Sequence, residues 1–73
     1  MQTEKIGQRI RYLRMRNGIT QKELAEALYV SESTVSGWER GRAEPSIDFI
    51  VRLTALFQTS LNYLIMGNKK TTP

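Results

Sequence analysis

The sequence contains neither cysteine nor histidine among its 73 residues. Without cysteine there is no disulfide to stabilise the fold and no thiol to react, which fits a reducing cytosol. Without both residue types a transition-metal site is not expected, and the commonest general base of enzymes is missing. The chain has no concentration of titratable residues that could build a catalytic site, so we expect no enzyme, no cofactor and no small-molecule ligand.

Long apolar runs are also missing. The longest falls far short of the roughly 20 residues that a membrane-spanning helix needs. The first residues, MQTEKIGQRIR, lack the apolar stretch of a secretory signal. A basic helix lying on a membrane surface is disfavoured, because the apolar stripe of Ile6, Ile10 and Leu13 is narrow and is needed for the core. We therefore expect a cytoplasmic protein with no membrane partner.

The charge that is present is mainly positive. Eleven Lys and Arg stand against seven Asp and Glu, which gives a net charge of +4 and a pI near 9.9. Five basic residues and no acid lie between Lys5 and Arg16. This excess favours a polyanionic partner.

Caps and apolar periodicity predict five short helices and no strand. The first spans about 4–17 with Thr3 as its cap, and Ser46 and Ser60 precede the last two. Residues 1–67 are expected to form one all-α domain, and 68–73 a polar tail or the start of a linker. The predicted buried stripe of the fourth helix is Ile47, Ile50, Leu53 and Phe57, and the apolar residues of the fifth helix include Leu61, Leu64 and Ile65.

The segment from Thr20 to Gly41 predicts a helix-turn-helix. Thr20 with Glu23 three residues later forms a capping box, Ser31 can cap a second helix, and Gly41 can end it. Val30 lies between the two helices as an apolar plug. Two helices joined by so short a turn are typical of this motif.

The second helix of this motif has an unusual outer face. Val35 and Trp38 lie three residues apart and point inward, so Trp38 is expected in the core rather than as a stacking platform. The opposite residues are all small or basic, and a small polar face can approach a DNA groove closely. They are Ser33, Ser36, Gly37 and Arg40.

The chain resembles the helix-turn-helix family of phage repressors, Cro proteins and XRE-type bacterial regulators. The motifs that carry the resemblance are IGQRIRYLR (6–14), TQKELAEAL (20–28), VSESTVSGWERG (30–41) and EPS (44–46). It implies a compact five-helix domain of the lambda-repressor type, encoded by a bacterium or a phage. Two departures are Tyr29 and Gln58, where relatives often carry glycine. The turn at Tyr29 is therefore either altered or held by packing of the ring.

Candidate site residues follow from position and from the resemblance. Residues at the start of a recognition helix reach base edges, and those around its ends meet phosphates. The resemblance makes Gln21 a phosphate donor and pairs Arg14 with Glu39. Arg9 and Arg11 are ambiguous, because a basic helix face is often only solvated. The expected base contacts are Glu32, Ser33, Ser36 and Gly37, and the expected phosphate contacts are Gln21, Ser31, Thr34, Arg40, Arg42 and Arg16.

Two functions remain open on the sequence alone. The first is a sequence-specific regulator of transcription, a repressor, that binds double-stranded DNA at a palindromic operator with helix 32–40 in the major groove. It would act as a homodimer through Tyr63, Ile65 and Met66, whose apolar bulk exceeds what a short helix can bury. The alternative is a protein-interaction module or antitoxin of the same fold, whose main partner is a protein.

Overall fold

The computed structural model describes residues 5–67, and these form five helices with no strand among them. This confirms the all-α prediction. The predicted tail 68–73 and the predicted cap Thr3 lie outside the described residues. No helix within 5–67 has the length and apolarity needed to cross a membrane. The helices are α1 (Ile6–Arg16), α2 (Gln21–Leu28), α3 (Glu32–Arg40), α4 (Ile47–Phe57) and α5 (Leu61–Met66).

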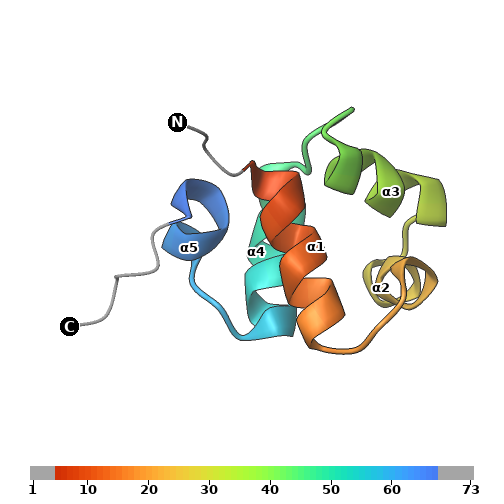
Figure 1. Cartoon of the computed structure of the whole chain (residues 1–73), viewed down its shortest axis with the longest axis horizontal. Helices are drawn as coiled ribbons and strands as arrows, with labels where there is room; N and C mark the ends of the chain where they lie inside the picture. The colour runs from red at the N-terminus through yellow and green to blue at the C-terminus, as the bar shows by residue number, and fades with distance from the viewer. Residues whose placement is uncertain (1–4, 68–73) are drawn as a thin grey trace.

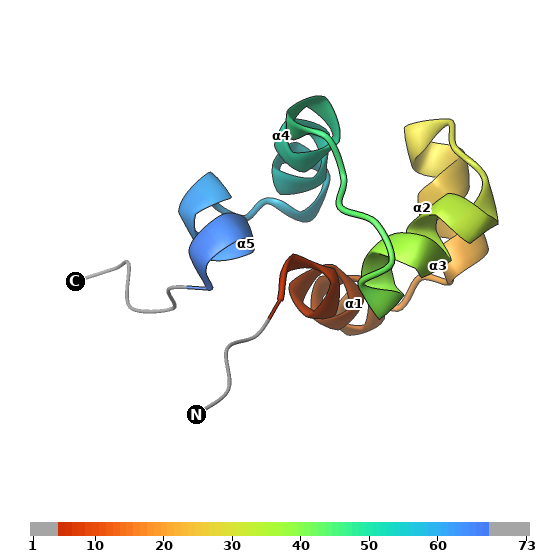
Figure 2. The ribbon, with the colours of Figure 1, turned by 90° about the horizontal axis from the view of Figure 1, so that it is seen from above.

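Two central helices, α1 and α4, separate the other three. In both views α2 and α3 lie on one side of this pair and α5 lies on the other (Figures 1 and 2). α1 contacts α3, α4 and α5, whereas α2 packs mainly on α3. The helix-turn-helix is therefore attached to the rest of the domain chiefly through the α1–α3 crossing.

Four of the helices begin at the predicted caps. The side chains of Thr20, Ser31, Ser46 and Ser60 each accept a hydrogen bond from the backbone N–H three residues on, at N···O distances of 2.9–3.4 Å. Each bond satisfies one of the free N–H groups of a helix start. These four boundaries are local properties of the sequence, and they are confirmed.

The start of α1 differs from the prediction. The helix begins at Ile6, with Lys5 as its N-cap and Asn17 as its C-cap. The backbone N–H of Lys5 donates to Gln8 Oε1 at 2.9 Å, which closes the helix start from inside the first turn. Lys5 offers no short oxygen, so its cap could not be recognised by residue type.

The core confirms most of the predicted inward residues. The prediction that Ile47 is buried is wrong, since this residue is 62% exposed. Phe49 fills the place against Trp38 instead, with ring centroids 5.4 Å apart. On α5, Leu61 and Ile65 are exposed, at 43% and 41%. The buried apolar residues are Ile10, Leu13, Leu24, Ala25, Leu28, Val35, Trp38, Ile50, Leu53, Phe57 and Leu64.

The crossing of α1 and α3 depends on Gly7. A Cβ built on Gly7 would lie 1.9 Å from the carbonyl oxygen of Trp38 and 3.2 Å from Cα of Glu39. Both atoms belong to the backbone of α3, so neither can rotate away as a side chain would. Only glycine permits this separation of the two helices.

Arg9 is buried rather than solvated, which corrects the reading of the α1 surface. The whole residue is only 3% exposed. Nε donates to the carbonyl of Leu64 at 2.8 Å, and Nη2 donates to the carbonyl of Ile65 at 2.8 Å. A cation is favourable at a helix C-terminus, because the last carbonyls are unpaired and carry partial negative charge. Arg9 therefore holds the end of α5 against α1.

Tyr29 and Gln58 end α2 and α4 in the left-handed conformation, with φ of 60° and 53°. Glycine carries no steric penalty in this conformation, whereas a residue with a side chain does. The turn at Tyr29 is retained, and Val30 N–H donates to the Ala25 carbonyl at 3.0 Å. Tyr29 is 91% exposed, so packing does not hold its ring.

Candidate nucleic-acid interface

The orientation of α3 is fixed at both ends and on one face. Ser31 caps its start, and Gly41 ends it with φ of 80°. Val35 and Trp38 are buried, at 0% and 4% exposure. The helical period then directs Ser33, Ser36 and Gly37 away from the core, as predicted.

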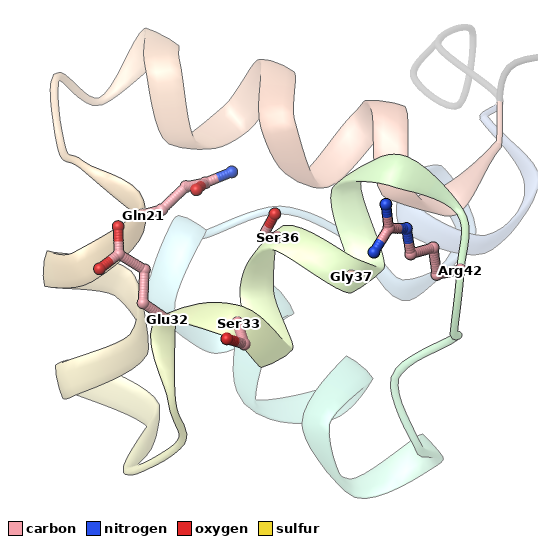
Figure 3. Close-up of a pocket in the computed structure, with 6 residues that line it drawn as sticks. All are labelled: Gln21, Glu32, Ser33, Ser36, Gly37 and Arg42. Carbon is pink, nitrogen blue, oxygen red and sulfur yellow. The ribbon is translucent and has the colours of Figure 1, made fainter.

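These outward residues line one shallow depression, which we call the α3 hollow (Figure 3). Its volume is about 390 Å³. Glu32 and Gln21 lie at one end of it and Arg42 at the other. The structure thus brings together all four predicted base-contacting residues and two of the predicted phosphate contacts. The lining residues are Gln21, Glu32, Ser33, Ser36, Gly37 and Arg42.

Gly37 keeps the middle of the α3 hollow open. A Cβ at this position would meet nothing within 4 Å. Packing therefore does not require glycine here, although glycine weakens a helix interior by roughly 1 kcal/mol relative to alanine. The effect of Gly37 is to leave the backbone of α3 accessible from outside.

A hydrogen-bonded network connects three helices beneath the hollow. Arg14 binds Glu39 through Nε–Oε2 at 2.7 Å and Nη2–Oε1 at 3.0 Å, which confirms the predicted pair. Arg14 Nη1 also donates to the Ile19 carbonyl at 2.9 Å. The side chains are 12% and 3% exposed, so the pair is largely removed from water. The hydrogen bond from Arg14 to Glu39 raises the pKa of Arg14 above its ordinary value.

Gln21 belongs to this network as well as to the hollow. Its Nε2 donates to Glu39 Oε1 at 3.0 Å. An amide nitrogen carries two hydrogens, so the second remains for another acceptor. Sequence reasoning placed Gln21 and Glu39 separately and missed this bond, because the residues are 18 positions apart and on different helices.

The remaining predicted phosphate contacts do not line the hollow. Ser31 and Thr34 bond each other at 2.9 Å between their hydroxyl oxygens, at the start of α3. Arg40 is exposed on its last turn. Arg16 lines a different depression, between the ends of α1 and α4, and its Nη1 donates to the Tyr12 hydroxyl at 3.3 Å. Its role as a phosphate contact stays a prediction.

The predicted pairing surface on α5 is partly exposed. Ile65 and Met66 are 41% and 67% exposed, and Tyr63 packs against the core with part of its side chain accessible. Within residues 5–67 no three acidic side chains gather closely enough to hold a metal ion.

Comparison with known proteins identifies the family. The model of a helix-turn-helix family, HTH_3, matches residues 10–64. The transcriptional regulator DicA of Escherichia coli is 40% identical over 68 residues, which are 93% of this chain and 50% of DicA. The regulator ImmR of Bacillus subtilis is 35% identical over 60 residues, 82% of this chain and 47% of ImmR. The chain thus spans half or less of these two relatives.

A solved structure extends the comparison to the whole domain. The P22 c2 repressor, crystallised in complex with a synthetic operator, superposes with a TM-score of 0.84 at 35% sequence identity. The match covers 90% of this chain and all of that one. The chain therefore belongs to the helix-turn-helix family of phage repressors and related regulators, as its motifs predict.

Proposed function

We propose that the chain binds double-stranded DNA in a sequence-specific manner, with α3 in the major groove, and that it regulates transcription as a repressor in the cytoplasm. The observation that carries the proposal is the α3 hollow. Small polar side chains occupy its centre, and groups suited to phosphate stand around it. A helix with so small an outer face fits a groove about 12 Å wide.

The positions of the donors support this assignment. Gln21 and Arg42 lie at opposite ends of the hollow (Figure 3). With α3 in the groove, each would be near one of the two phosphate backbones. The start of α3 adds a positive helix end that attracts phosphate. The P22 relative, similar over the whole domain, is itself bound to an operator in its crystal.

We further propose that two copies bind a palindromic operator. Ile65 and Met66 leave an exposed apolar surface on α5, on the side of the molecule opposite the helix-turn-helix (Figure 1). A two-fold axis through this surface, with Tyr63 at its edge, would allow two α3 helices to meet successive major grooves about 34 Å apart. Sedimentation of the free protein with Met66→Glu as a matched variant tests the preformed dimer. If the free protein is a strict monomer at high concentration, dimerisation can occur only on DNA.

The experiment that tests the function separates base reading from phosphate binding. Loss of a base-reading group relaxes preference at one base pair, whereas loss of a phosphate contact weakens all sequences alike. We expect Ser33→Ala to narrow the ratio of specific to random affinity and Arg42→Ala to leave that ratio unchanged. Gly37→Lys, which has open space for its side chain, should fold and alter the base preference. Affinities come from gel shifts against a selected site and random DNA.

The outcomes also distinguish DNA binding from the alternative function as a protein-interaction module. If Ser33→Ala and Gly37→Lys both keep the parental preference, α3 is not the reading element. If the parent binds no DNA at low salt, the protein-interaction function replaces the proposed one, with the exposed apolar residues of α5 as the first surface to test.

A further inference from the structure

The first residue of the recognition helix carries an unpaired negative charge. Glu32 is exposed and lines the α3 hollow. Within residues 5–67 its carboxylate has no hydrogen-bond or ion-pair partner. Arg42 is the cation that lines the same hollow, and it lies at the opposite end (Figure 3). The Ser31 hydroxyl beside Glu32 is already bound to Thr34.

A carboxylate here opposes binding to most DNA. The backbone of DNA is negative, and an ionised carboxylate can only accept hydrogen bonds. Guanine presents two acceptors in the major groove, and thymine presents an acceptor and a methyl group. Against these edges Glu32 would lose its water without gaining a partner. Only cytosine N4 and adenine N6 offer a donor.

Cytosine suits the carboxylate better than adenine does. On adenine the N7 acceptor lies next to the N6 donor, so the second carboxylate oxygen faces a lone pair. In a base pair adenine N6 thus lies between two acceptors, its own N7 and thymine O4, whereas cytosine N4 has an acceptor on one side only, O6 of the paired guanine. The hydroxyl groups of Ser33 and Ser36, which also line the hollow, can both donate and accept hydrogen bonds. They therefore discriminate less between bases.

We propose that Glu32 selects a cytosine in each half-site, and that it does so largely by rejecting edges that present acceptors. This inference rests on the proposed DNA-binding function. It makes Glu32 a specificity-determining residue that lowers affinity for random DNA while it preserves affinity for the cognate site. Discrimination by repulsion is a general route to specificity.

The test compares the parent with Glu32→Gln and Glu32→Ala, and uses Glu26→Gln as the charge-matched control. Glu26 is exposed on α2 and does not line the hollow. Each protein selects sites from a random pool of duplex DNA, and its affinity is then measured for the four bases at the selected pair. Circular dichroism melting establishes that each variant is folded.

We expect the parent to enrich cytosine at one pair of each half-site, with roughly 5- to 150-fold discrimination there. Glu32→Gln should change that preference to adenine, because a glutamine amide can bind N6 and N7 together. Glu32→Ala should lose the preference and bind random DNA more tightly than the parent. The control should keep the parental preference.

Two results would overturn the inference. One is a selected half-site in which no position prefers a C·G pair in either orientation, and the other is a Glu32→Ala variant with the parental preference intact. Both leave the DNA-binding function standing, whereas a parent that binds no duplex DNA would remove the inference and that function together.

Discussion

Gly7 on α1 and Gly37 on α3 lie in opposite surroundings, one closely packed and one open. Gly7 faces the backbone of α3, and a Cβ would lie 1.9 Å from the Trp38 carbonyl oxygen. Gly37 faces open space in the α3 hollow. Gly7 is required by the close approach of two helices, whereas Gly37 leaves part of the α3 hollow empty. The same substitution should therefore act in opposite directions at the two sites.

We expect Gly7→Ala to destabilise the fold by about 1–3 kcal/mol, the usual range for overpacking. Gly37→Ala should stabilise it by up to about 1 kcal/mol, since alanine favours a helix. For a domain of this size, 1 kcal/mol corresponds to roughly 4–8 °C in melting temperature. Thermal unfolding of the two variants measures both effects. A Gly7→Ala melting temperature equal to or above that of the parent would show that the α1–α3 crossing tolerates a methyl group.

The left-handed tyrosine gives a second prediction for single residues. An ordinary residue in this conformation costs roughly 1–2 kcal/mol, and the exposed ring of Tyr29 offers no packing in return. Tyr29→Gly should raise stability by about 0.5–1 kcal/mol, after the greater freedom of glycine in the unfolded chain is subtracted. Tyr29→Ala is the control, because it keeps the strained backbone. Identical denaturation midpoints for the two variants would contradict this account.

At the scale of elements, the network around Glu39 joins three helices. Arg14 comes from α1, Gln21 from α2 and Glu39 from α3, and each bond is 3.0 Å or shorter. The folded state raises the pKa of Arg14, so its contribution is complete below the ordinary arginine pKa and is lost only as pH rises beyond it. We therefore expect no loss of this charge at neutral or mildly alkaline pH.

Removal of Glu39 tests the network. Glu39→Ala leaves the charge of Arg14 largely out of water, and stranding one member of such a pair costs roughly 3 kcal/mol. It also removes the acceptor that orients Gln21. We expect a clear fall in melting temperature and weaker binding to all DNA sequences, with base preference kept. Glu26→Ala, at an exposed site on α2, is the control and should change little. A Glu39→Ala protein as stable as the parent would mean that the pair contributes nothing.

The same scale shows what sequence reasoning could reach. Helix starts at Thr20, Ser31, Ser46 and Ser60 were predictable because a cap acts on an N–H three residues away. The outer face of α3 was predictable because the two inward residues Val35 and Trp38 define its buried face, and the helical period then gives the opposite one. Ile47, Arg9 and the Gln21–Glu39 bond could not be predicted in this way, because each depends on a distant segment that only the folded chain brings near.

For the whole molecule, the basic excess predicts how binding responds to salt. If a dimer neutralises about six phosphates, the logarithm of the association constant should fall with the logarithm of salt concentration with a slope of about −5. Arg42→Ala should flatten this slope by about one unit for each phosphate that is no longer neutralised. Titration of a labelled duplex with added potassium chloride gives the slope. Affinity that is independent of salt would rule out the electrostatic mode of binding.

The way in which Arg9 holds α5 bears on how such domains diverge. Its guanidinium binds the main-chain carbonyls of Leu64 and Ile65 and no α5 side chain in these two bonds. A main-chain carbonyl is present whatever residue occupies the position, so substitutions on the outer side of α5 leave this attachment in place. Ile65 and Met66 are thereby free to change while the helix stays docked. Two gene copies that share this arrangement can diverge on the outer surface of α5 without rebuilding the fold or α3.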